Sequence, residues 1–336
     1  MVKVSVILPV YGVAEYIVKC TESLLAQTLD DMEFLFVDDH GPDNSIELLR
    51  QTIAGHPREH QFRILRPEHN LGAGMARNYA IPEAKGEYIA FVDSDDSIDA
   101  EMFERLYDEA VRNDSDLCCC QMQKYYPDGT VGAILENPHV EPGLLDHDKR
   151  AYILTHYVSL FASILFRRSL VEQYGLRFPE ERSADDSYFV SCAWMMARSV
   201  SYVDRPFYHY LIRPGSVCTT KDSDKYKKRM RVFEKLMAFA HEQGVYDEYA
   251  AELDFMYFKK GYILSAINYV TNALEPRRDT LREIADQGRR QIPHYRRNPY
   301  IRSKMALRVL DRMISGCPRL AVVVLRWYAQ RKQVVC

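Results

Sequence analysis

The sequence predicts an α/β protein in which a doubly wound, largely parallel sheet is followed by a helical C-terminal region. Through the first hundred residues, short apolar runs alternate with segments of helical spacing. This βαβ pattern is typical of parallel strands joined by crossover helices. After Gly215-Ser216 the pattern changes to long helical stretches. The 336 residues are 47% hydrophobic and 27% charged, which excludes disordered and fibrous classes and allows one large domain with an appendage.

Each element follows from this spacing. Strands are expected at residues 4–8, 34–37, 62–65, 88–92 and 117–126, and helices at residues 14–27, 45–53, 72–84, 101–113 and 187–197. Residues 148–175 have helical spacing with a strand-like interruption. Long helices are expected at residues 222–243, 246–274, 279–291 and 300–314. We therefore place a boundary near residue 220, between an α/β domain (1–220, with halves 1–115 and 116–220) and a helical basic region (221–336).

An acidic triplet follows the fourth expected strand. Asp93, Ser94 and Asp95 come directly after residues 88–92, and ligands of such sheets bind outside the carboxyl ends of the strands. Two carboxylates one residue apart can bind a hard divalent cation and leave positions for phosphate oxygens. The alternative is an acidic helix N-terminus, and this is our interpretation of Asp96 and Asp99, as caps of the helix that begins near residue 101.

A second acidic pair, Asp38-Asp39, ends the second expected strand at the same edge. Its carboxylates can accept hydrogen bonds from a nucleoside, or the pair can simply begin a turn.

Residues 70–78 open a helix with Gly72 and Gly74, but Arg77 stands where a dinucleotide fingerprint needs its third glycine, which argues against a Rossmann dehydrogenase. Arg77 can bind a phosphate or form a surface salt bridge.

The sequence also indicates the cellular compartment of the protein. Residues 1–9 are apolar for too few positions to form a signal peptide, and no stretch reaches the length that spans a bilayer. Eight cysteines without such a signal indicate free thiols in a reducing compartment. The consecutive residues 118–120 alternate across a strand and cannot converge on one metal ion. We expect a cytoplasmic protein.

Several segments occur together, in order, in a pattern that resembles family 2 glycosyltransferases of GT-A fold, of the bacterial polysaccharide type. They are Val4–Tyr11, Phe36–Asp39, Asn70–Gly72 with Ala76–Asn78, Gly86–Asp96, and Asp185–Phe189 with its flanking Arg177–Glu180 and Tyr210–Ser216. The likeness covers roughly residues 1–215. The chain departs from the family at Gly12, at His40-Gly41 and at Asp185, the last of which replaces a glutamate.

The resemblance implies a role for each matching residue. The resemblance implies that Pro9, Val10, Tyr11 and Asp39 contact the donor nucleoside, and Glu15, Arg77, Asp93, Ser94 and Asp95 complete the set of candidate donor-binding residues. Asp93 and Asp95 would form the DXD motif that holds Mn²⁺ or Mg²⁺, and Asp186 would be the catalytic base. Asp38, Asp185, His209 and Arg213 are lesser candidates, and His209 is also interpreted as a hydrogen-bonded structural residue.

The implied activity is inverting transfer of a sugar from a nucleotide-diphosphate donor, a UDP-sugar, to a hydroxyl of a glycan or lipid-linked glycan in cell-surface polysaccharide synthesis. One alternative is a nucleotidyltransferase, but that class needs a basic phosphate loop after the first strand, and residues 11–15 carry no basic side chain. The other is a non-catalytic nucleotide- or sugar-binding module, which would more readily have lost Asp95 or Asp186. No nucleic-acid-binding module is evident.

The charge is distributed unevenly. The net charge is −3, yet residues 277–336 contain fifteen Lys and Arg against four Asp and Glu. Residues 300–332 mix these basic residues with apolar ones, as do helices that lie on anionic membranes. Such a helix can bind peripherally to the inner face of the plasma membrane. The alternative is a helix that packs its apolar side on the protein and exposes its basic side.

Overall fold

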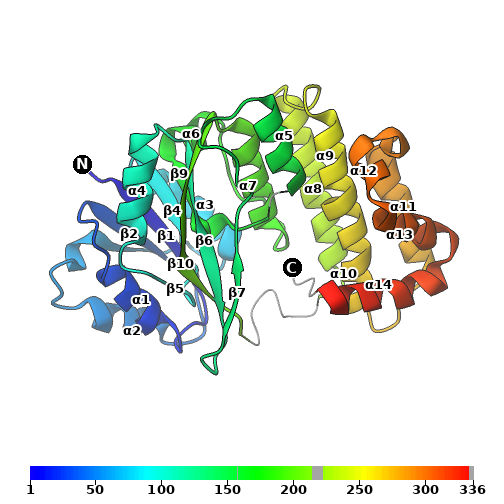
Figure 1. The fold of residues 1–336 in the computed structure, drawn as a ribbon. Coiled ribbons are helices and arrows are strands. Elements are labelled where there is room, and N and C mark those ends of the chain that lie inside the picture. Colours follow the sequence, from blue (N-terminus) through cyan, green and yellow to red (C-terminus); the bar gives the residue numbers. More distant parts are fainter. Residues whose placement is uncertain (157, 214–221, 333–336) are drawn as a thin grey trace. The chain divides into compact units, whose positions relative to one another are not determined.

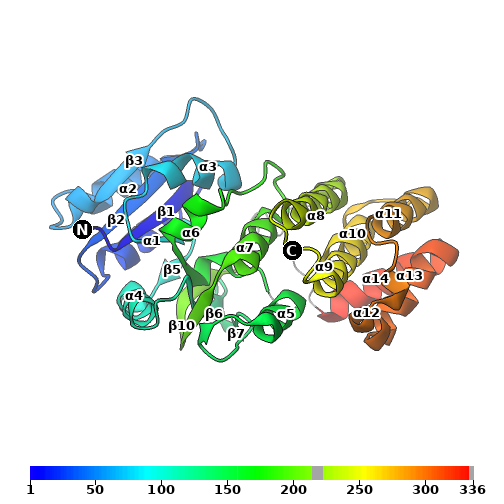
Figure 2. The ribbon, with the colours of Figure 1, turned by 90° about the horizontal axis from the view of Figure 1, so that it is seen from above.

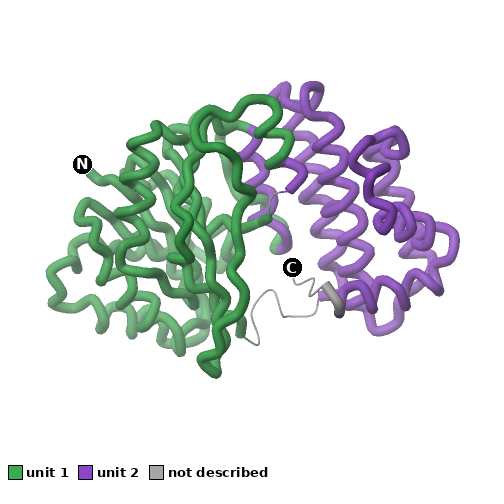
Figure 3. Tube along the Cα trace, viewed as in Figure 1, with its two compact units in different colours: residues 1–153, 157–182, 196–213 green, residues 154–156, 183–195, 214–336 purple. Residues whose placement is uncertain are grey.

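The computed structural model describes residues 1–156, 158–213 and 222–332, which form parts of two compact units (Figure 3). Unit 1 comprises Met1–Ile153, Tyr157–Arg182 and Met196–Arg213, and unit 2 comprises Leu154–His156, Ser183–Met195 and Pro214–Cys336. The boundary predicted near residue 220 lies outside the described residues. Residues 183–195, which we had assigned to the α/β domain, pack with unit 2.

Unit 1 is built on one sheet (Figure 1), whose order is β3-β2-β1-β4-β9-β6-β10-β5, with β7 beside β6 and β8 beside β10. The strands are β1 (Val4–Val10), β2 (Met32–Asp38), β3 (Phe62–Leu65), β4 (Tyr88–Phe91), β5 (Ser97–Ile98), β6 (Leu117–Tyr125), β7 (Val131–Leu135), β8 (Gly143–Leu144), β9 (Ile164–Arg167) and β10 (Ser199–Leu211). The helices are α1 (Ile17–Leu25), α2 (Ser45–Ile53), α3 (Ala73–Ala80), α4 (Met102–Arg112), α6 (Arg168–Gln173) and most of α5 (His147–His156), whose last three residues belong to unit 2. Short 3₁₀ turns occur at Glu59–Gln61, Ile81–Glu83 and Phe161–Ser163.

The first four strands are parallel, because a helical crossover returns the chain to the same end of the sheet each time. β1 and β2 are buried along their whole length, as expected of a sheet covered on both faces. Their register pairs Val10 with Asp38, and that of β1 with β4 pairs Ile7 with Phe91. The three strands therefore end at one edge of the sheet, where both acidic segments begin.

Beyond β4 the sheet is mixed. β9 lies antiparallel between β4 and β6, and β10 then runs parallel to β6. Cys118, Cys119 and Cys120 lie consecutively on β6 as buried free thiols. The predicted α/β fold with a GT-A-like sheet is confirmed, with β9 as an antiparallel insertion among the larger parallel set.

Unit 2 is helical, as predicted. It contains most of α7 (Asp185–Met196), followed by α8 (Lys225–Glu242), α9 (Ala250–Met256), the π-helix η4 (Tyr257–Ile263), α10 (Leu264–Asn272), α11 (Arg278–Gln291), the 3₁₀ turn Tyr295–Arg297, α12 (Pro299–Ser303), α13 (Met305–Gly316) and α14 (Pro318–Lys332). α9, η4 and α10 form one continuous helical run that lies beside α8 (Figure 2). Within the described ranges, no helix is long and apolar enough to cross a bilayer.

Candidate active site

The carboxyl ends of β1, β2 and β4 meet in unit 1. The backbone N–H of Asp39 donates to the carbonyl of Val10 at 3.1 Å, which joins the first acidic pair to the end of β1. The Ser94 hydroxyl donates to the Pro9 carbonyl at 2.7 Å, which joins the acidic triplet to the same strand. Pro9 and Val10 are thus fixed between the two acidic segments, and the next residue, Tyr11, is 54% exposed.

The carboxylate of Asp39 organises the loop before α3. It is 1% exposed and accepts hydrogen bonds from the backbone N–H groups of Leu71 and Gly72, at 2.6 and 2.8 Å, and from the Asn70 amide at 3.0 Å. Gly72 has φ +81°, and a Cβ there would lie 2.6 Å from Nε of Arg182. Only glycine fits this turn, so Asp39 and Gly72 together fix the start of α3.

Arg77 projects from α3 to Asp93. Its guanidinium is buried, forms a very short ion pair with the Asp93 carboxylate, and packs 4.6 Å from the ring centre of Phe161 and 5.2 Å from that of Phe178. Cation–π contact and burial both favour a fixed arginine. Arg77 is therefore not a surface residue, and its guanidinium is held in place. A phosphate that contacts Arg77 would have to lie beside Asp93.

Asp95 is paired with Arg213. The Arg213 Nε donates to the Asp95 carboxylate at 2.8 Å, and the guanidinium lies 4.7 Å from the ring centre of Tyr16. Burial raises the pKa of Asp95, and the negative charge of Asp93 raises it further, whereas Arg213 lowers it. Asp95 thus experiences both a negative charge, that of Asp93, and a positive one, that of Arg213.

Asp96 has a structural role that differs from our prediction. Its carboxylate is buried and accepts from the hydroxyl of Tyr208 at 2.6 Å and from the backbone N–H of Leu211 at 2.7 Å. The same hydroxyl accepts from the backbone N–H of Asp93 at 3.1 Å. Helix α4 has no side-chain cap, so the interpretation of Asp96 and Asp99 as caps was wrong: Asp96 instead anchors β10 beneath the triplet.

A small cavity of about 60 Å³ opens beside Asp95. It is lined by Glu15, Tyr16, Lys19, Asp95, Ser97, Tyr125, His209 and Leu211. His209 stacks on Tyr125 with ring centres 4.9 Å apart, and its Nε2 lies 3.0 Å from the carboxylate of Asp99. Burial lowers the pKa of His209, and the Asp99 charge opposes this. Glu15 and His209 thus line the same cavity as Asp95.

The remaining predicted residues stand on other elements of the two units. Asp38 accepts from the backbone N–H of His40 at 3.3 Å and lies 3.5 Å from Nε of Arg66. Asp185 and Asp186 stand in the first turn of α7, in unit 2, and the Asp186 carboxylate accepts from the N–H of Ser187 at 2.7 Å.

The acidic triplet suits a divalent cation. Asp93 and Asp95 offer hard oxygen ligands, and each carboxylate is already paired with an arginine, Arg77 or Arg213. No group of three or more His, Cys, Asp or Glu in the described part of the chain is placed to bind a metal ion.

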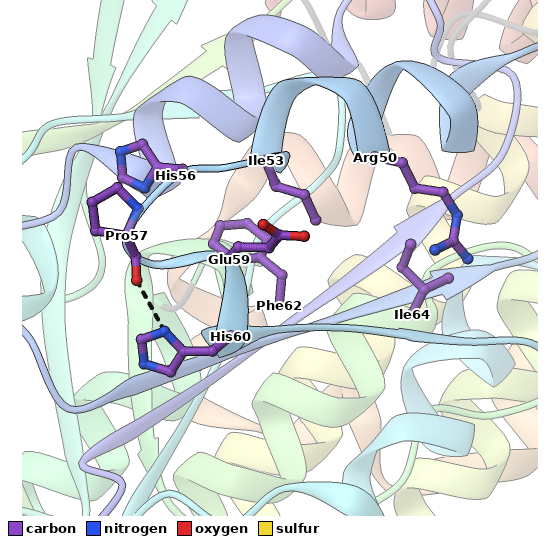
Figure 4. Close-up of a pocket in the computed structure, with 8 residues that line it drawn as sticks. All are labelled: Arg50, Ile53, His56, Pro57, Glu59, His60, Phe62 and Ile64. Carbon is purple, nitrogen blue, oxygen red and sulfur yellow. Dashed lines mark hydrogen bonds between the residues drawn. The ribbon is translucent and has the colours of Figure 1, made fainter.

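A second cavity lies elsewhere in unit 1. It measures about 610 Å³ and is lined by Arg50, Ile53, His56, Pro57, Glu59, His60, Phe62 and Ile64 (Figure 4). These residues come from α2, β3 and the turn between them, at the β3 edge of the sheet. None of the acidic residues described above lines it, so it does not belong to the candidate active site.

Three residues that shape the site were not among those predicted from the sequence. Tyr16 packs on Arg213, Tyr208 joins Asp96 to the backbone of the triplet, and Asn70 donates to Asp39. Asn70 belongs to a segment that we had singled out, so the signal was present. Nothing near Tyr208 in the sequence indicates its role, because its partners lie 112 and 115 positions away.

The chain is similar to known proteins in both sequence and structure. Residues 5–175 match the family described as "Glycosyl transferase family 2", and the chain belongs to this family. It is 32% identical over 258 residues to EpsH of Bacillus subtilis, named as a glycosyltransferase, across 75% of this chain and 73% of that one. It is also 32% identical to the poly(ribitol-phosphate) beta-glucosyltransferase of Bacillus spizizenii, across 63% of this chain and 32% of that longer protein.

Solved structures show the same fold. S. aureus TarS (residues 1–349) in complex with UDP covers 95% of this chain and 91% of its own, with a TM-score of 0.64 and 21% identity. The mannosyltransferase PcManGT from Pyrobaculum calidifontis, in complex with GDP-Man and Mn²⁺, covers 98% of this chain and 88% of its own, with a TM-score of 0.54 and 15% identity. The protein is thus a glycosyltransferase of GT-A fold, and the nucleotidyltransferase and non-catalytic alternatives are set aside.

Proposed function

We propose that this glycosyltransferase transfers a hexose from a UDP-sugar, with inversion, to a hydroxyl of a cell-surface polysaccharide or its lipid-linked precursor. One observation carries the proposal. Asp93 and Asp95 lie at the meeting point of three parallel strand ends, between two arginines and beside the end of β1. This is where a sheet of this kind binds a ligand, and the paired charges suit a diphosphate with its cation.

The donor would bind at this edge. Tyr11 offers an exposed ring for the base, and Asp38, Asp39 and Glu15 offer carboxylates for base and ribose. Asp93 and Asp95 would hold Mn²⁺ or Mg²⁺, which supplies positive charge for the departing diphosphate. Arg77 and Arg213, which already neutralise these carboxylates, would add to that charge. The complexes of TarS with UDP and with UDP-GlcNAc support UDP as the nucleotide.

The chemistry would be a single displacement. Asp186 takes the proton of the acceptor hydroxyl while its oxygen attacks the anomeric carbon, opposite the nucleotide. The bond to the diphosphate breaks as the new glycosidic bond forms, so the anomeric centre inverts. The Asp185–Phe189 segment supports this role through its match to the family motif. The named activity of the Bacillus spizizenii relative supports a wall or surface polymer as acceptor.

A hydrolysis assay tests the donor and the metal together. We expect the purified chain to hydrolyse one UDP-sugar slowly with Mn²⁺ and to lose this activity with EDTA. A panel of UDP-, GDP- and dTDP-sugars in thermal shift then identifies the nucleotide. If a GDP-sugar alone stabilises the protein, the proposed nucleotide is wrong; if activity survives EDTA treatment, the metal assignment is wrong.

We also propose that α13 and α14 bind an anionic membrane surface. These helices contact one another and expose large apolar side chains: Met305 and Val309 on α13, and Leu320, Val323 and Trp327 on α14. The spacings of four, and of three and four, put each set on one helix face. Arg302, Lys304, Arg308, Arg312 and Arg319 are exposed nearby in the sequence, and each basic residue near such a surface contributes about 1 kcal/mol.

Packing explains only part of the apolar pattern. Leu310, Ile314, Ala321 and Leu325 are buried, as the packing alternative requires. The exposed apolar side chains of α13 and α14 are not covered by this packing and are available to bind a membrane. Sedimentation with phosphatidylglycerol-containing vesicles should pull down the protein, and phosphatidylcholine vesicles should not. Replacing Val323 and Trp327 with serine should abolish binding, and equal, negligible sedimentation with both lipids would refute the proposal.

A further inference from the structure

Residues 176–182, between α6 and α7, form an irregular segment that is tied to α3. The side-chain amide of Asn78 bonds both polar groups of the Phe178 backbone: its Nδ2 donates to the carbonyl at 2.7 Å, and its Oδ1 accepts from the N–H at 2.8 Å. The Phe178 ring is buried and packs on the Arg77 guanidinium. These contacts hold the segment on α3, close in sequence to its last residue, Arg182.

The guanidinium of Arg182 lies on the turn that begins α3. A Cβ on Gly72 would lie 2.6 Å from Nε and 2.9 Å from Cζ of Arg182, so the guanidinium packs directly on the glycine backbone. The Arg182 Nη2 also donates to Oδ1 of Asn70 at 3.0 Å. Within the described residues, Arg182 is exposed and forms no ion pair with a carboxylate. Asn70 is therefore the polar partner that determines where this charge lies.

Asn70 connects the charge of Arg182 to Asp39. Its Nδ2 donates to the Asp39 carboxylate at 3.0 Å and to the Asp39 carbonyl at 2.7 Å, while its Oδ1 accepts from Arg182. An amide turned over would place its NH₂ group against the guanidinium and its oxygen against the carboxylate, and both pairs would repel. The cation therefore fixes the orientation in which the amide donates to Asp39.

The same loop supplies the backbone donors of Asp39. The N–H groups of Leu71 and Gly72 donate to this carboxylate at 2.6 and 2.8 Å. Arg182 contacts the residues on both sides of Leu71, so its removal would loosen the side-chain donor and the backbone donors together. Hydrogen bonds in such a network strengthen one another. The position of the Asp39 carboxylate thus depends on a residue from a distant part of the sequence.

We propose that Arg182 is a positioning residue for the donor nucleoside. Through Asn70 and the Gly72 turn, it holds the Asp39 carboxylate and residues 70–72 in the arrangement that binds the base or the ribose. This inference rests on the proposed role of Asp39 in donor binding. Arg182 acts through Asn70 and not on the donor itself, and it affects the binding of the nucleotide rather than the chemical step.

Calorimetric titration with UDP in the presence of Mn²⁺ tests this role. Arg182→Met keeps the stem of the side chain over Gly72 but removes the charge and the hydrogen bond to Asn70. We expect UDP to bind about 5- to 10-fold more weakly, the loss expected of one hydrogen bond to a charged group. KM for the UDP-sugar should rise by the same factor, with kcat within about twofold of wild type.

Two further substitutions serve as controls. Arg182→Lys keeps the charge and should recover part of the UDP affinity. Arg177→Met is the matched control on the same segment, because the Arg177 guanidinium donates to the carbonyl of its neighbour Leu176; it should bind UDP as the wild type does. The thermal midpoint is measured for every variant. A lowered midpoint with unchanged UDP affinity in Arg182→Met would show a purely structural role and overturn the proposal.

A double-mutant cycle separates positioning from direct contact. Asn70→Ala removes the connection to Asp39, so adding Arg182→Met should weaken UDP binding no further. Asn70→Ser takes its place if Asn70→Ala does not fold. If the two losses of affinity add, Arg182 acts on the nucleotide directly and the positioning role is wrong.

The behaviour of Asp39→Asn shows which proposal fails. If Asp39→Asn weakens UDP binding while Arg182→Met binds UDP as the wild type does, the positioning role is wrong and the nucleoside site stands. If both variants bind UDP as the wild type does, the proposed role of Asp39 is wrong, and the inference falls with it.

Discussion

Replacing Asp39 with alanine should lower the thermal stability of unit 1, whatever its effect on sugar transfer. The carboxylate is buried and accepts two backbone N–H groups and the Asn70 amide. A hydrogen bond to a charged group contributes about 1.5–3 kcal/mol, but Leu71 and Gly72 are half-exposed and water can replace part of the loss. We therefore expect a net loss of about 3 kcal/mol, or roughly 6–12 °C in thermal midpoint for a unit of this size.

The assay is thermal unfolding followed by circular dichroism, with UDP titrated in a second series. Asp39→Asn should lose less than Asp39→Ala, because an amide oxygen can still accept from one N–H. Asp148→Ala is the control, since that side chain is fully exposed. A midpoint within about 2 °C of wild type for Asp39→Ala would refute the view that this carboxylate holds the loop before α3. A large loss of UDP binding in a fully stable variant would assign Asp39 to the nucleoside alone.

Three further predictions concern acidic residues. Asp95→Ala should abolish transfer and metal-dependent donor binding, because the diphosphate charge would be left uncompensated; Asp128→Ala, in an exposed turn, should bind UDP with Mn²⁺ as the wild type does in calorimetry. Tyr208→Phe should cost about 1.5–3 kcal/mol in urea unfolding, since buried Asp96 loses a donor; an unchanged midpoint would contradict its anchoring role. Asp311→Ala should cost about 3–5 kcal/mol, because it leaves the Arg289 guanidinium without its buried partner; loss of helical signal at lower urea would show this.

The sequence determined the first strands and helices of unit 1 and the helices of unit 2, but it did not predict β5, β8 or β10. Strands β1, β2 and β4 and the acidic residues at their ends were predictable because strand burial and helical spacing are local patterns. The helical region beyond residue 222 was predictable for the same reason. Since parallel strands end at one edge, the sequence also brought Asp39 and Asp93 into one neighbourhood.

Tertiary structure decided which partners these side chains have. Asp95 and Arg213 lie 118 positions apart, and Tyr208 and Asp96 lie 112 apart. No periodicity encodes such pairs, because they depend on where β9 inserts and how β10 then aligns with β6 and β5. The π-helix η4 likewise packs against α8 and α11, which are distant from one another in the sequence. Local sequence fixes which residues form a strand or helix, whereas the partner of a buried charge is set by chain segments that meet only after folding.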